Sequence, residues 1–195
     1  MEKTLSSIGD LHRSPKIGVM GSAQRAITGR GEELFASLAE RLGQVIADRG
    51  CVLVTGATTG VPDLVSRSVR RHGGLSIGIS PAFSKEEHVS RYSLPEDGVD
   101  VLIYTGFGLK GRNVINIRSS DIVIIFGGGI GTLNEFTIAY DEDKIIGVLE
   151  GTGGVTEQIQ EIVKLSRKRG RVELVFSDDP ETLVDACLRL WSRSV

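Results

Sequence analysis

Short apolar segments alternate with longer amphipathic segments along this chain of 195 residues, and this alternation limits its fold more than any other feature. We expect strands at 16–20, 51–55, 75–80, 101–105, 122–126, 144–149 and 172–176. We expect helices at 31–49, 61–72, 112–119, 155–169 and 180–191, and one more after 127–131 that ends near Tyr140. Because the strands are apolar nearly throughout and lie between helices, they predict an α/β fold. Its core is a Rossmann-like, doubly wound parallel sheet of about seven strands, flanked by helices.

The ends of the chain and one internal segment depart from this alternation. Residues 1–14 are polar and mixed, which favours a flexible lead-in over a signal peptide. Residues 15–195 show neither an internal repeat nor a linker, so we expect a single nucleotide- or phosphate-binding domain. The segment 81–100 is polar and irregular, and it is the best candidate for a lid or a partner-contact loop. Arg91 within it is a further candidate for contact with a ligand or a partner.

The composition excludes several classes of function. A formal net charge of -2 gives no basic footprint for nucleic acid. No apolar run reaches the roughly 18 residues that a membrane helix needs, so we expect no membrane association. Cys51 and Cys187 both fall in apolar patterns, which indicates small core residues and a cytoplasmic protein. The three histidines are far apart and lack metal-ligand spacing, so no metal site is expected.

Glycine-rich turns follow three of the expected strands. Glycine lets the backbone approach a ligand closely, and the next helix directs unpaired N–H groups at it, so a phosphate is the natural occupant. The alternative is that the glycines only form tight turns, and the turn hydroxyls could equally stabilise those turns. The candidate phosphate-binding residues are Gly21, Ser22, Gly56, Thr58, Thr59, Gly128, Gly129, Gly131 and Thr132.

The common nucleotide fingerprints are absent from these turns. Thr132 stands where a G-x-G-x-x-G motif starting at Gly127 needs its last glycine, and no acidic residue follows the second strand, which ends in Thr55. Arg112 and Asn113 replace the Lys and Ser/Thr of a Walker A loop. The chain is therefore predicted to be neither an NAD dehydrogenase nor a P-loop NTPase.

The run at 127–135, GGGIGTLNE, resembles the P-G-G-x-G-T-x-x-E signature of the Lonely Guy type phosphoribohydrolases, which are often mislabelled lysine decarboxylases. Residues 109–113, LKGRN, take the place of that family's M-H-x-R-K motif. The resemblance extends over about 16–150 and is most specific between Arg112 and Glu135. Pyridoxal-dependent decarboxylation needs a Schiff-base lysine and an acidic partner for the ring nitrogen. It is rejected here, because the region of the glycine turns supplies no such lysine and Lys110 is the only nearby candidate.

The resemblance implies a reaction and an assembly. It makes Arg112 and Glu135 the catalytic pair that cleaves the N-glycosidic bond of a nucleoside 5'-monophosphate, with no cofactor required. It also implies a homodimer or higher homo-oligomer. The stretch 111–121, GRNVINIRSSD, looks more like a sister branch that includes molybdenum-cofactor carriers, which bind a phosphorylated pterin without turning it over. Gly127 and Asn113 replace the proline and lysine of the hydrolase motifs, which favours the carrier.

The key side chains also have structural interpretations. Thr132 and Glu135 have the spacing of a helix capping box, and a carboxylate at a helix N-terminus is held ionised. Arg112 is expected to open its helix just after a glycine loop, where a guanidinium suits phosphate, although lone arginines are often surface residues. Ligand contact and helix capping are both open for Asn113 and Asn116. Three hypotheses follow: an N-glycosidase, a carrier or sensor of a phosphorylated pterin or nucleotide, and, least favoured, an interaction scaffold with a vestigial site.

Overall fold

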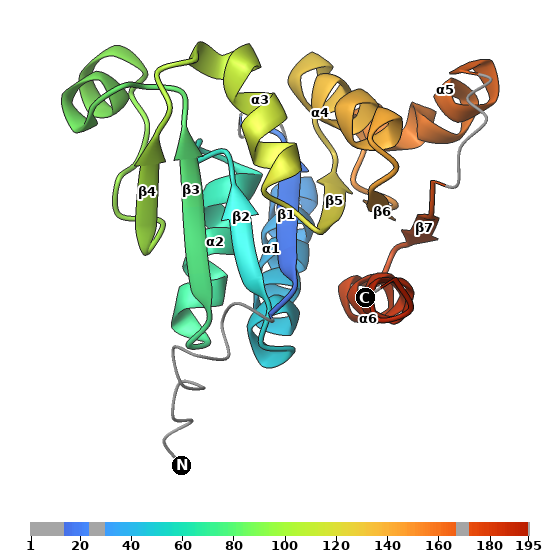
Figure 1. The fold of residues 1–195 in the computed structure, drawn as a ribbon. Coiled ribbons are helices and arrows are strands. Elements are labelled where there is room, and N and C mark those ends of the chain that lie inside the picture. The colour runs from blue at the N-terminus through green and yellow to red at the C-terminus, as the bar shows by residue number, and fades with distance from the viewer. Residues whose placement is uncertain (1–13, 24–29, 167–171, 195) are drawn as a thin grey trace.

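The computed structural model describes residues 14–23, 30–166 and 172–194. Its centre is a seven-stranded sheet in the order β4-β3-β2-β1-β5-β6-β7 (Figure 1). Every neighbouring pair of strands is parallel. This confirms the α/β, Rossmann-like fold that the alternating pattern predicts. The strand order reverses between β1 and β5, so the connections diverge at the carboxyl ends of these two strands.

The strands are β1 (Lys16–Gly21), β2 (Val52–Thr55), β3 (Leu75–Ser80), β4 (Val101–Tyr104), β5 (Ile122–Phe126), β6 (Ile145–Leu149) and β7 (Leu174–Ser177). The α-helices are α1 (Arg30–Asp48), α2 (Val61–Arg71), α3 (Gly108–Arg118), α4 (Ile130–Asp141), α5 (Ile159–Ser166) and α6 (Pro180–Trp191). A π-helical turn, η2 (Glu87–Arg91), and a 3-10 turn, η3 (Gly154–Gln158), complete the described elements. Most elements begin and end within two residues of the sequence-based expectation.

Two helices differ from the prediction by more than their ends. Helix α3 begins at Gly108 rather than at Arg112. The helix expected at 155–169 begins instead as the 3-10 turn η3 and becomes α-helical only at Ile159, and residues 167–169 lie outside the described residues. Gly153 is the N-cap of this turn and Gly154 is its first residue, and both have positive φ, which explains the irregular first turn.

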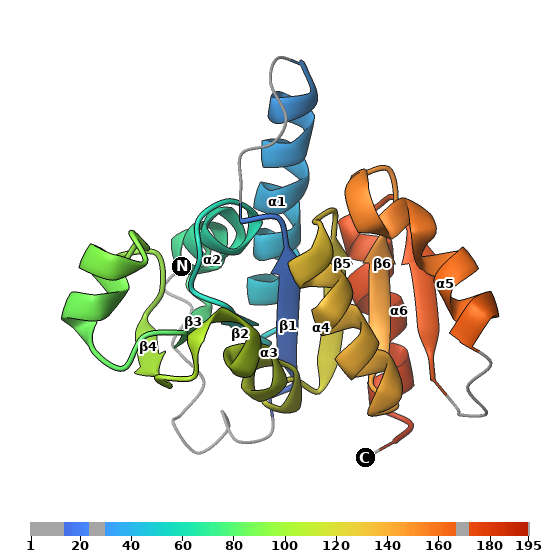
Figure 2. The same ribbon diagram turned by 90° about the horizontal axis from the view of Figure 1, so that it is seen from above.

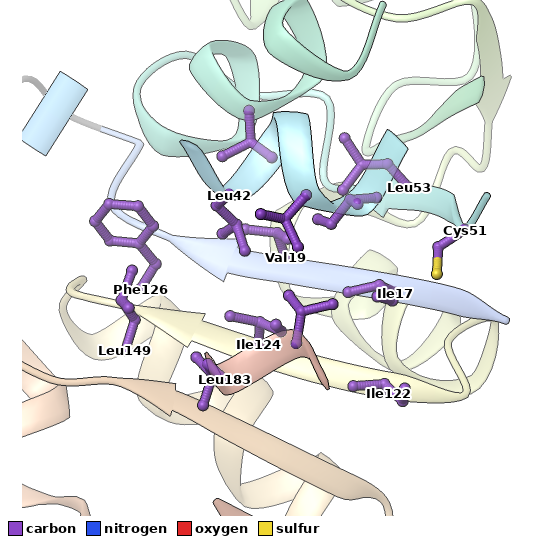
Figure 3. Packing of buried hydrophobic residues seen from close by; sticks show 14 of the residues in the cluster. Ile17, Val19, Leu42, Cys51, Leu53, Ile122, Ile124, Phe126, Leu149 and Leu183 are labelled. Atoms are coloured by element: carbon purple, nitrogen blue, oxygen red, sulfur yellow. The ribbon is translucent and has the colours of Figure 1, made fainter. Parts of the chain in front are cut away.

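Helices cover both faces of the sheet (Figure 2). On one face, Ile17, Ile124 and Phe126 of the strands belong to a buried cluster with Leu42 of α1 and Leu183 of α6 (Figure 3). On the other face, strands β1, β5 and β6 share a second cluster with α3, α4 and α5. Each fully buried side chain of this size contributes about 1.5–3 kcal/mol relative to exposure, so the two clusters fix the sheet and hold its carboxyl edge in place.

Both cysteines belong to the first cluster, as the sequence predicts. Cys51 and Cys187 are buried free thiols, and burial raises the pKa of each to about 12. A thiol in this state is protonated at neutral pH and is a poor nucleophile. Among the described helices, none combines the length and the apolar character that crossing a membrane requires.

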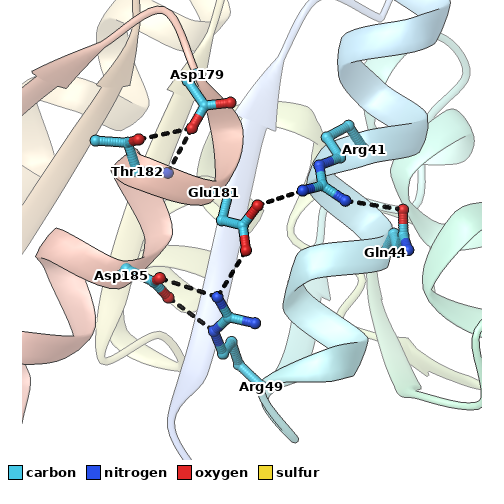
Figure 4. A network of polar contacts seen from close by, with 7 residues as sticks. All are labelled: Arg41, Gln44, Arg49, Asp179, Glu181, Thr182 and Asp185. Atoms are coloured by element: carbon cyan, nitrogen blue, oxygen red, sulfur yellow. Dashed lines mark hydrogen bonds and ion pairs between the residues drawn. The ribbon is translucent and has the colours of Figure 1, made fainter.

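Polar contacts tie α1 to α6 on the outer surface (Figure 4). Arg49 donates to both carboxylate oxygens of Asp185 at 2.7 and 2.9 Å and to Glu181 at 3.0 Å, and Arg41 pairs with Glu181 as well. Asp179 caps α6 by accepting from Thr182 N at 2.7 Å. Such exposed pairs stabilise a fold modestly, typically by less than about 1 kcal/mol each.

The segment 81–100 is more regular than its sequence suggests, and the prediction of an irregular segment is wrong at η2. Ser84 Oγ accepts from Glu87 N at 3.2 Å, and the Glu87 carboxylate accepts from Phe83 N at 2.8 Å, so these two bonds tie the start of the turn to the residues before it. The buried His88 ring lies 2.8 Å from Ser80 Oγ and 3.0 Å from the Pro95 carbonyl. Arg91 pairs with Glu87 and stacks on Tyr92.

Candidate functional site

A cavity of ≈ 320 Å³ lies where the strand order reverses, beyond the carboxyl ends of β1 and β2. In open parallel sheets this switch point is where ligands bind, because the diverging connections leave a crevice there. The volume falls within the range of small-molecule sites, about 300–1,000 Å³. The end of β1, the turn after β2, the first turns of α3 and the first turns of α4 line it.

Ten of the twelve candidate residues line this cavity. They are Gly21, Ser22, Gly56, Thr58, Arg112, Asn113, Gly129, Gly131, Thr132 and Glu135. The sequence analysis assigned no role in the site to the other residues that line the cavity, although Leu109 and Lys110 belong to its second motif. The other lining residues are Val19, Met20, Ala23, Pro62, Leu109, Lys110 and Ile130.

Thr59 and Gly128 do not line the cavity, for structural reasons. Thr59 is exposed, and its hydroxyl donates to the Ala23 carbonyl at 2.5 Å, which corresponds to the turn-stabilising alternative. Gly128 has φ +90, and its carbonyl accepts from Val155 N at 2.9 Å. A Cβ at Gly128 would lie 2.1 Å from Thr132 Oγ1. This glycine is therefore required by the turn.

The N-terminus of α4 opens into the cavity. The first backbone hydrogen bond of α4 runs from Leu133 N to the Gly129 carbonyl at 2.9 Å, so the N–H groups of the three preceding residues have no acceptor within the helix. Among the described residues, a Cβ added at Gly129 would meet nothing within 4 Å, and one at Gly131 would meet only Lys110 Nζ, at 3.5 Å. The turn thus offers free donors beside open space.

Arg112 is enclosed rather than exposed. It lies in the second turn of α3, so the expectation that it opens the helix is wrong. Its side chain is 6% exposed and lies so close to Gly56 that a Cβ there would be 1.6 Å from Nη1. Its Nε has no hydrogen-bond partner among the described residues, and burial lowers the pKa of the guanidinium. A buried donor without a partner is costly, so this N–H is available to a molecule that enters the cavity.

Glu135 faces Arg112, with Oε1 3.8 Å from Nη1. The capping-box interpretation is wrong, because Gly129 is the N-cap of α4, no side chain caps the helix, and Thr132 lies inside it. Glu135 is therefore in the second turn, away from the helix terminus. Burial raises the pKa of its carboxyl, and this outweighs the opposing effects of Arg112, an Asn116 hydrogen bond and Lys110. The expectation that a helix terminus holds this carboxylate ionised is also wrong.

Two asparagines of α3 lie beside this pair. The Asn113 amide contacts Asn134 Oδ1 at 2.8 Å, and in the reversed amide orientation its nitrogen reaches Glu135 Oε1 at 3.2 Å. Asn116 is fully buried and does not line the cavity, and its amide nitrogen donates to Met20 Sδ at 3.2 Å. Its Oδ1 has no partner among the described residues. Neither asparagine caps the helix, so the capping alternative is excluded for both.

Lys110, Leu109 and Ile130 surround the mouth of the cavity. Leu109 and Ile130 are 47% and 78% exposed, and Lys110 is also exposed. The lysine and the α4 N-terminus therefore give the mouth a positive field, while the apolar side chains border it. Among the described residues, no group of three or more histidine, cysteine or acidic side chains is arranged to hold a metal ion.

The parallel sheet and the glycine-lined cavity at its switch point define a Rossmann-like α/β protein, and the sequence comparison specifies its family. The family model described as the SLOG cluster4 family matches residues 14–184. The chain belongs to this family, which is part of the LOG-like superfamily. This confirms the resemblance inferred from the glycine-rich motif.

Individual relatives extend this assignment. An uncharacterised protein of Archaeoglobus fulgidus is 35% identical over 135 residues, which cover 69% of this chain and 80% of that protein. The molybdenum cofactor binding protein of Rippkaea orientalis is 32% identical, with a TM-score of 0.74 over 91% of this chain and 98% of that one. The molybdenum cofactor carrier protein of Chlamydomonas reinhardtii is 28% identical, with a TM-score of 0.71 over 92% of this chain and 99% of that one.

The raised pKa of Glu135 predicts a pH effect on stability. The folded protein holds a proton on the Glu135 carboxyl at pH values above 4.5, where the unfolded chain has already lost it. The resulting stabilisation is fully present below pH 4.5, and it is lost as the pH rises through the folded-state pKa. Across that window, the free energy of unfolding of the wild type should fall relative to Glu135→Gln, by at most about 1.4 kcal/mol per pH unit. Chemical denaturation of both proteins between about pH 4 and pH 8 measures this difference.

Glu142→Gln is the matched control for this measurement. Glu142 caps the far end of α4 and pairs with Arg118 at the surface, outside the cavity. It measures what removal of a surface carboxylate from α4 does to stability over the same window. A Glu135→Gln difference that varies with pH no more than this control does would contradict the assignment of a raised pKa to the Glu135 carboxyl.

Proposed function

We propose that the cavity at the β1–β5 switch point binds a phosphorylated small molecule of the pterin or nucleotide type, and that the protein serves as a carrier or sensor of it. One observation carries the proposal: the enclosed guanidinium of Arg112, whose Nε has no partner among the described residues. A structural arginine in the core would have its donors satisfied. An arginine that lines a cavity with a free donor is suited to a ligand.

The phosphate is assigned to the first turn of α4. The unpaired N–H groups there, the Thr132 side chain and Lys110 supply donors and positive charge, and Gly129 and Gly131 leave the space open. The sequence motifs favoured contact between Arg112 and the phosphate, but Glu135 lies 3.8 Å from that guanidinium. A carboxylate so close disfavours a second anion, so Arg112 is better suited to the uncharged part of the ligand.

The residues present also fit the molybdenum cofactor, which the two structurally similar proteins are described as binding or carrying. Its phosphate would be held at the first turn of α4, and its flat ring system would lie against Val19, Met20 and Pro62 near Arg112. The cofactor itself supplies the metal and the sulfur atoms that hold it. Neither Cys51 nor Cys187 lines the cavity, so this chain adds no thiol there.

A second candidate function is N-glycosidic cleavage of a nucleoside 5'-monophosphate. The Arg112–Glu135 pair favours it, because a buried carboxyl with a raised pKa can act as a general acid. Under this alternative the pair would face the sugar and its bond to the base. The expected homodimer or higher homo-oligomer stays a prediction in either case, as does the expected absence of a nucleic-acid partner.

A screen for base release separates the two functions. As a carrier, the purified protein should release no free base or ribose 5-phosphate from any common nucleoside monophosphate, yet at least one phosphorylated heterocycle should bind. As a glycosidase, it should cleave at least one monophosphate and ignore the matching nucleoside, since the phosphate anchors the sugar. Glu135→Gln should then lower turnover by about a hundredfold or more and change affinity little. Chromatography of the reaction mixtures gives both readouts, and base release that survives Glu135→Gln would exclude this carboxyl as the catalytic group.

A further inference from the structure

Four features of the buried end of the cavity bear on which ring it takes, and the first is the positions of Arg112 and Glu135. The side chains are 6% and 9% exposed, and they approach to 3.8 Å without forming a close hydrogen bond. A buried ion pair that served stability alone would close to hydrogen-bonding distance, because desolvation is costly otherwise. The separation leaves both groups able to bond with a third molecule.

The second feature is the order of donors and acceptors along this wall. The guanidinium of Arg112 only donates hydrogen bonds, and its Nε has no partner among the described residues. The ionised carboxylate of Glu135 only accepts them. The two side chains therefore present a ligand with a hydrogen-bond donor from Arg112 beside the two acceptor oxygens of Glu135. The complementary ligand edge presents one carbonyl oxygen beside two N–H donors.

The third feature is the apolar surface around them. Val19, Met20 and Pro62 line the cavity together with this pair, and all three are buried. Such side chains pack against the face of a flat ring, and the polar pair then meets its edge. A sugar would present several hydroxyl groups to this apolar surface and leave them without partners.

The fourth feature is the direction in which a ligand enters. The free N–H groups of α4 and the exposed Lys110 lie at the mouth, whereas Arg112 and Glu135 are buried. A phosphorylated ligand therefore binds with its phosphate at the mouth and its ring at the buried end. This orientation rests on the proposed function.

We propose that Arg112 and Glu135 form a specificity site for a 2-amino-4-oxopyrimidine edge, the edge shared by guanine and pterin rings. Arg112 donates to the ring carbonyl, and Glu135 accepts from the adjacent ring N–H and from the exocyclic amino group. Hypoxanthine lacks the amino group and loses one of these bonds. Adenine reverses the pattern, because it presents a lone pair to Glu135 and an amino group to Arg112.

The test is a calorimetric titration at about pH 8, which favours the ionised carboxylate. The probes are GMP, IMP, AMP and neopterin monophosphate. GMP and neopterin monophosphate should bind tightest, IMP about tenfold more weakly, and AMP at least about a hundredfold more weakly, since a site built to pair with polar groups rejects a ligand that leaves them unpaired. The preference of GMP over AMP should shrink to within about fivefold in Glu135→Gln, whose amide no longer presents two acceptors.

Glu142→Gln makes the same chemical change on α4 outside the cavity, and it should keep the wild-type preference. Circular dichroism and thermal melting of each variant show whether it is folded. Equal affinities for GMP, IMP and AMP in the wild type would overturn the specificity site and leave the proposed function standing. If none of the four probes binds, the proposed function itself fails. A preference for GMP that survives Glu135→Gln would overturn the assignment to this carboxylate.

Discussion

Replacing Gly129 with valine is expected to abolish the binding of phosphorylated ligands while the protein stays folded. Gly129 has a negative φ of -121, and a Cβ there would meet nothing within 4 Å in the described part of the chain. The new side chain would fill the space that the phosphate needs in front of the free N–H groups of α4. We expect affinity to fall by about a hundredfold or more, the scale of losing several charge-assisted hydrogen bonds. Calorimetry with GMP and neopterin monophosphate measures the loss.

Two other substitutions make this result specific. Thr137→Val places the same side chain at an exposed position of α4 outside the cavity, and it should bind like the wild type. Gly128→Val should instead disturb the fold, because Gly128 has φ +90 and its Cβ would collide with Thr132. A folded Gly129→Val protein with unchanged affinity would show that the phosphate binds elsewhere.

The double replacement Arg112→Met with Glu135→Leu is expected to make the ligand-free protein more stable and to eliminate ligand binding. The pair is desolvated, its closest charged atoms lie 3.8 Å apart, and one of its donors has no partner among the described residues. Apolar residues of similar size in place of such a pair are neutral or stabilise by about 1–4 kcal/mol. For a chain of this length, each kcal/mol raises the melting temperature by about 2–4 °C.

The single variants supply the comparison. Glu135→Leu leaves the buried guanidinium without its counter-charge and should cost roughly 3–5 kcal/mol. Arg112→Met should cost less, because burial already raises the pKa of Glu135 and the carboxyl can become neutral by taking up a proton. Calorimetric melting of all four proteins measures these changes. A double variant several kcal/mol less stable than the wild type would mean that the pair stabilises the fold.

The sheet could be predicted from the sequence because its signals are local. Strands such as Ile122–Phe126 are wholly apolar, and all five residues are buried, as a central parallel strand requires. The glycine turns could be predicted for a related reason. Parallel strands end at one edge, so residues after β1, β2 and β5 converge even though they are distant along the chain.

The start of α3 was not predicted, because glycines close together in sequence are typical of a loop. The run Gly106 to Gly111 looks like a loop, yet α3 begins within it at Gly108. A Cβ at Gly111 would lie 2.9 Å from Phe107 Cβ, so this glycine permits close packing inside the first turn. Because the start of the helix was predicted too late in the chain, Arg112 was expected at a helix terminus, whereas it lies in the second turn.

The interpretation of Glu135 failed for a similar reason. The spacing of Thr132 and Glu135 fits a capping box, but the spacing does not say which residue is the N-cap. The turn at Gly128 brings Gly129 to that position, and Glu135 is buried against Arg112.

The role of Lys110 in the site was not predicted. Lys110 lies on α3 and Gly131 on α4, and only the fold brings these two residues together. In contrast, the hydrogen bond from Glu87 N to Ser84 Oγ is local, and its S-x-x-E spacing could have predicted it.

The central claim is that this cavity binds a heterocycle through its phosphate. The most direct test is a calorimetric titration of the wild type with GMP and neopterin monophosphate, each beside its dephosphorylated counterpart. We predict that at least one phosphorylated compound binds with a micromolar or tighter Kd, and that its counterpart binds about a hundredfold more weakly, because the α4 N-terminus and Lys110 then lose their anion. Equal affinities for the two members of each pair, or no binding by either phosphorylated compound, would contradict the claim.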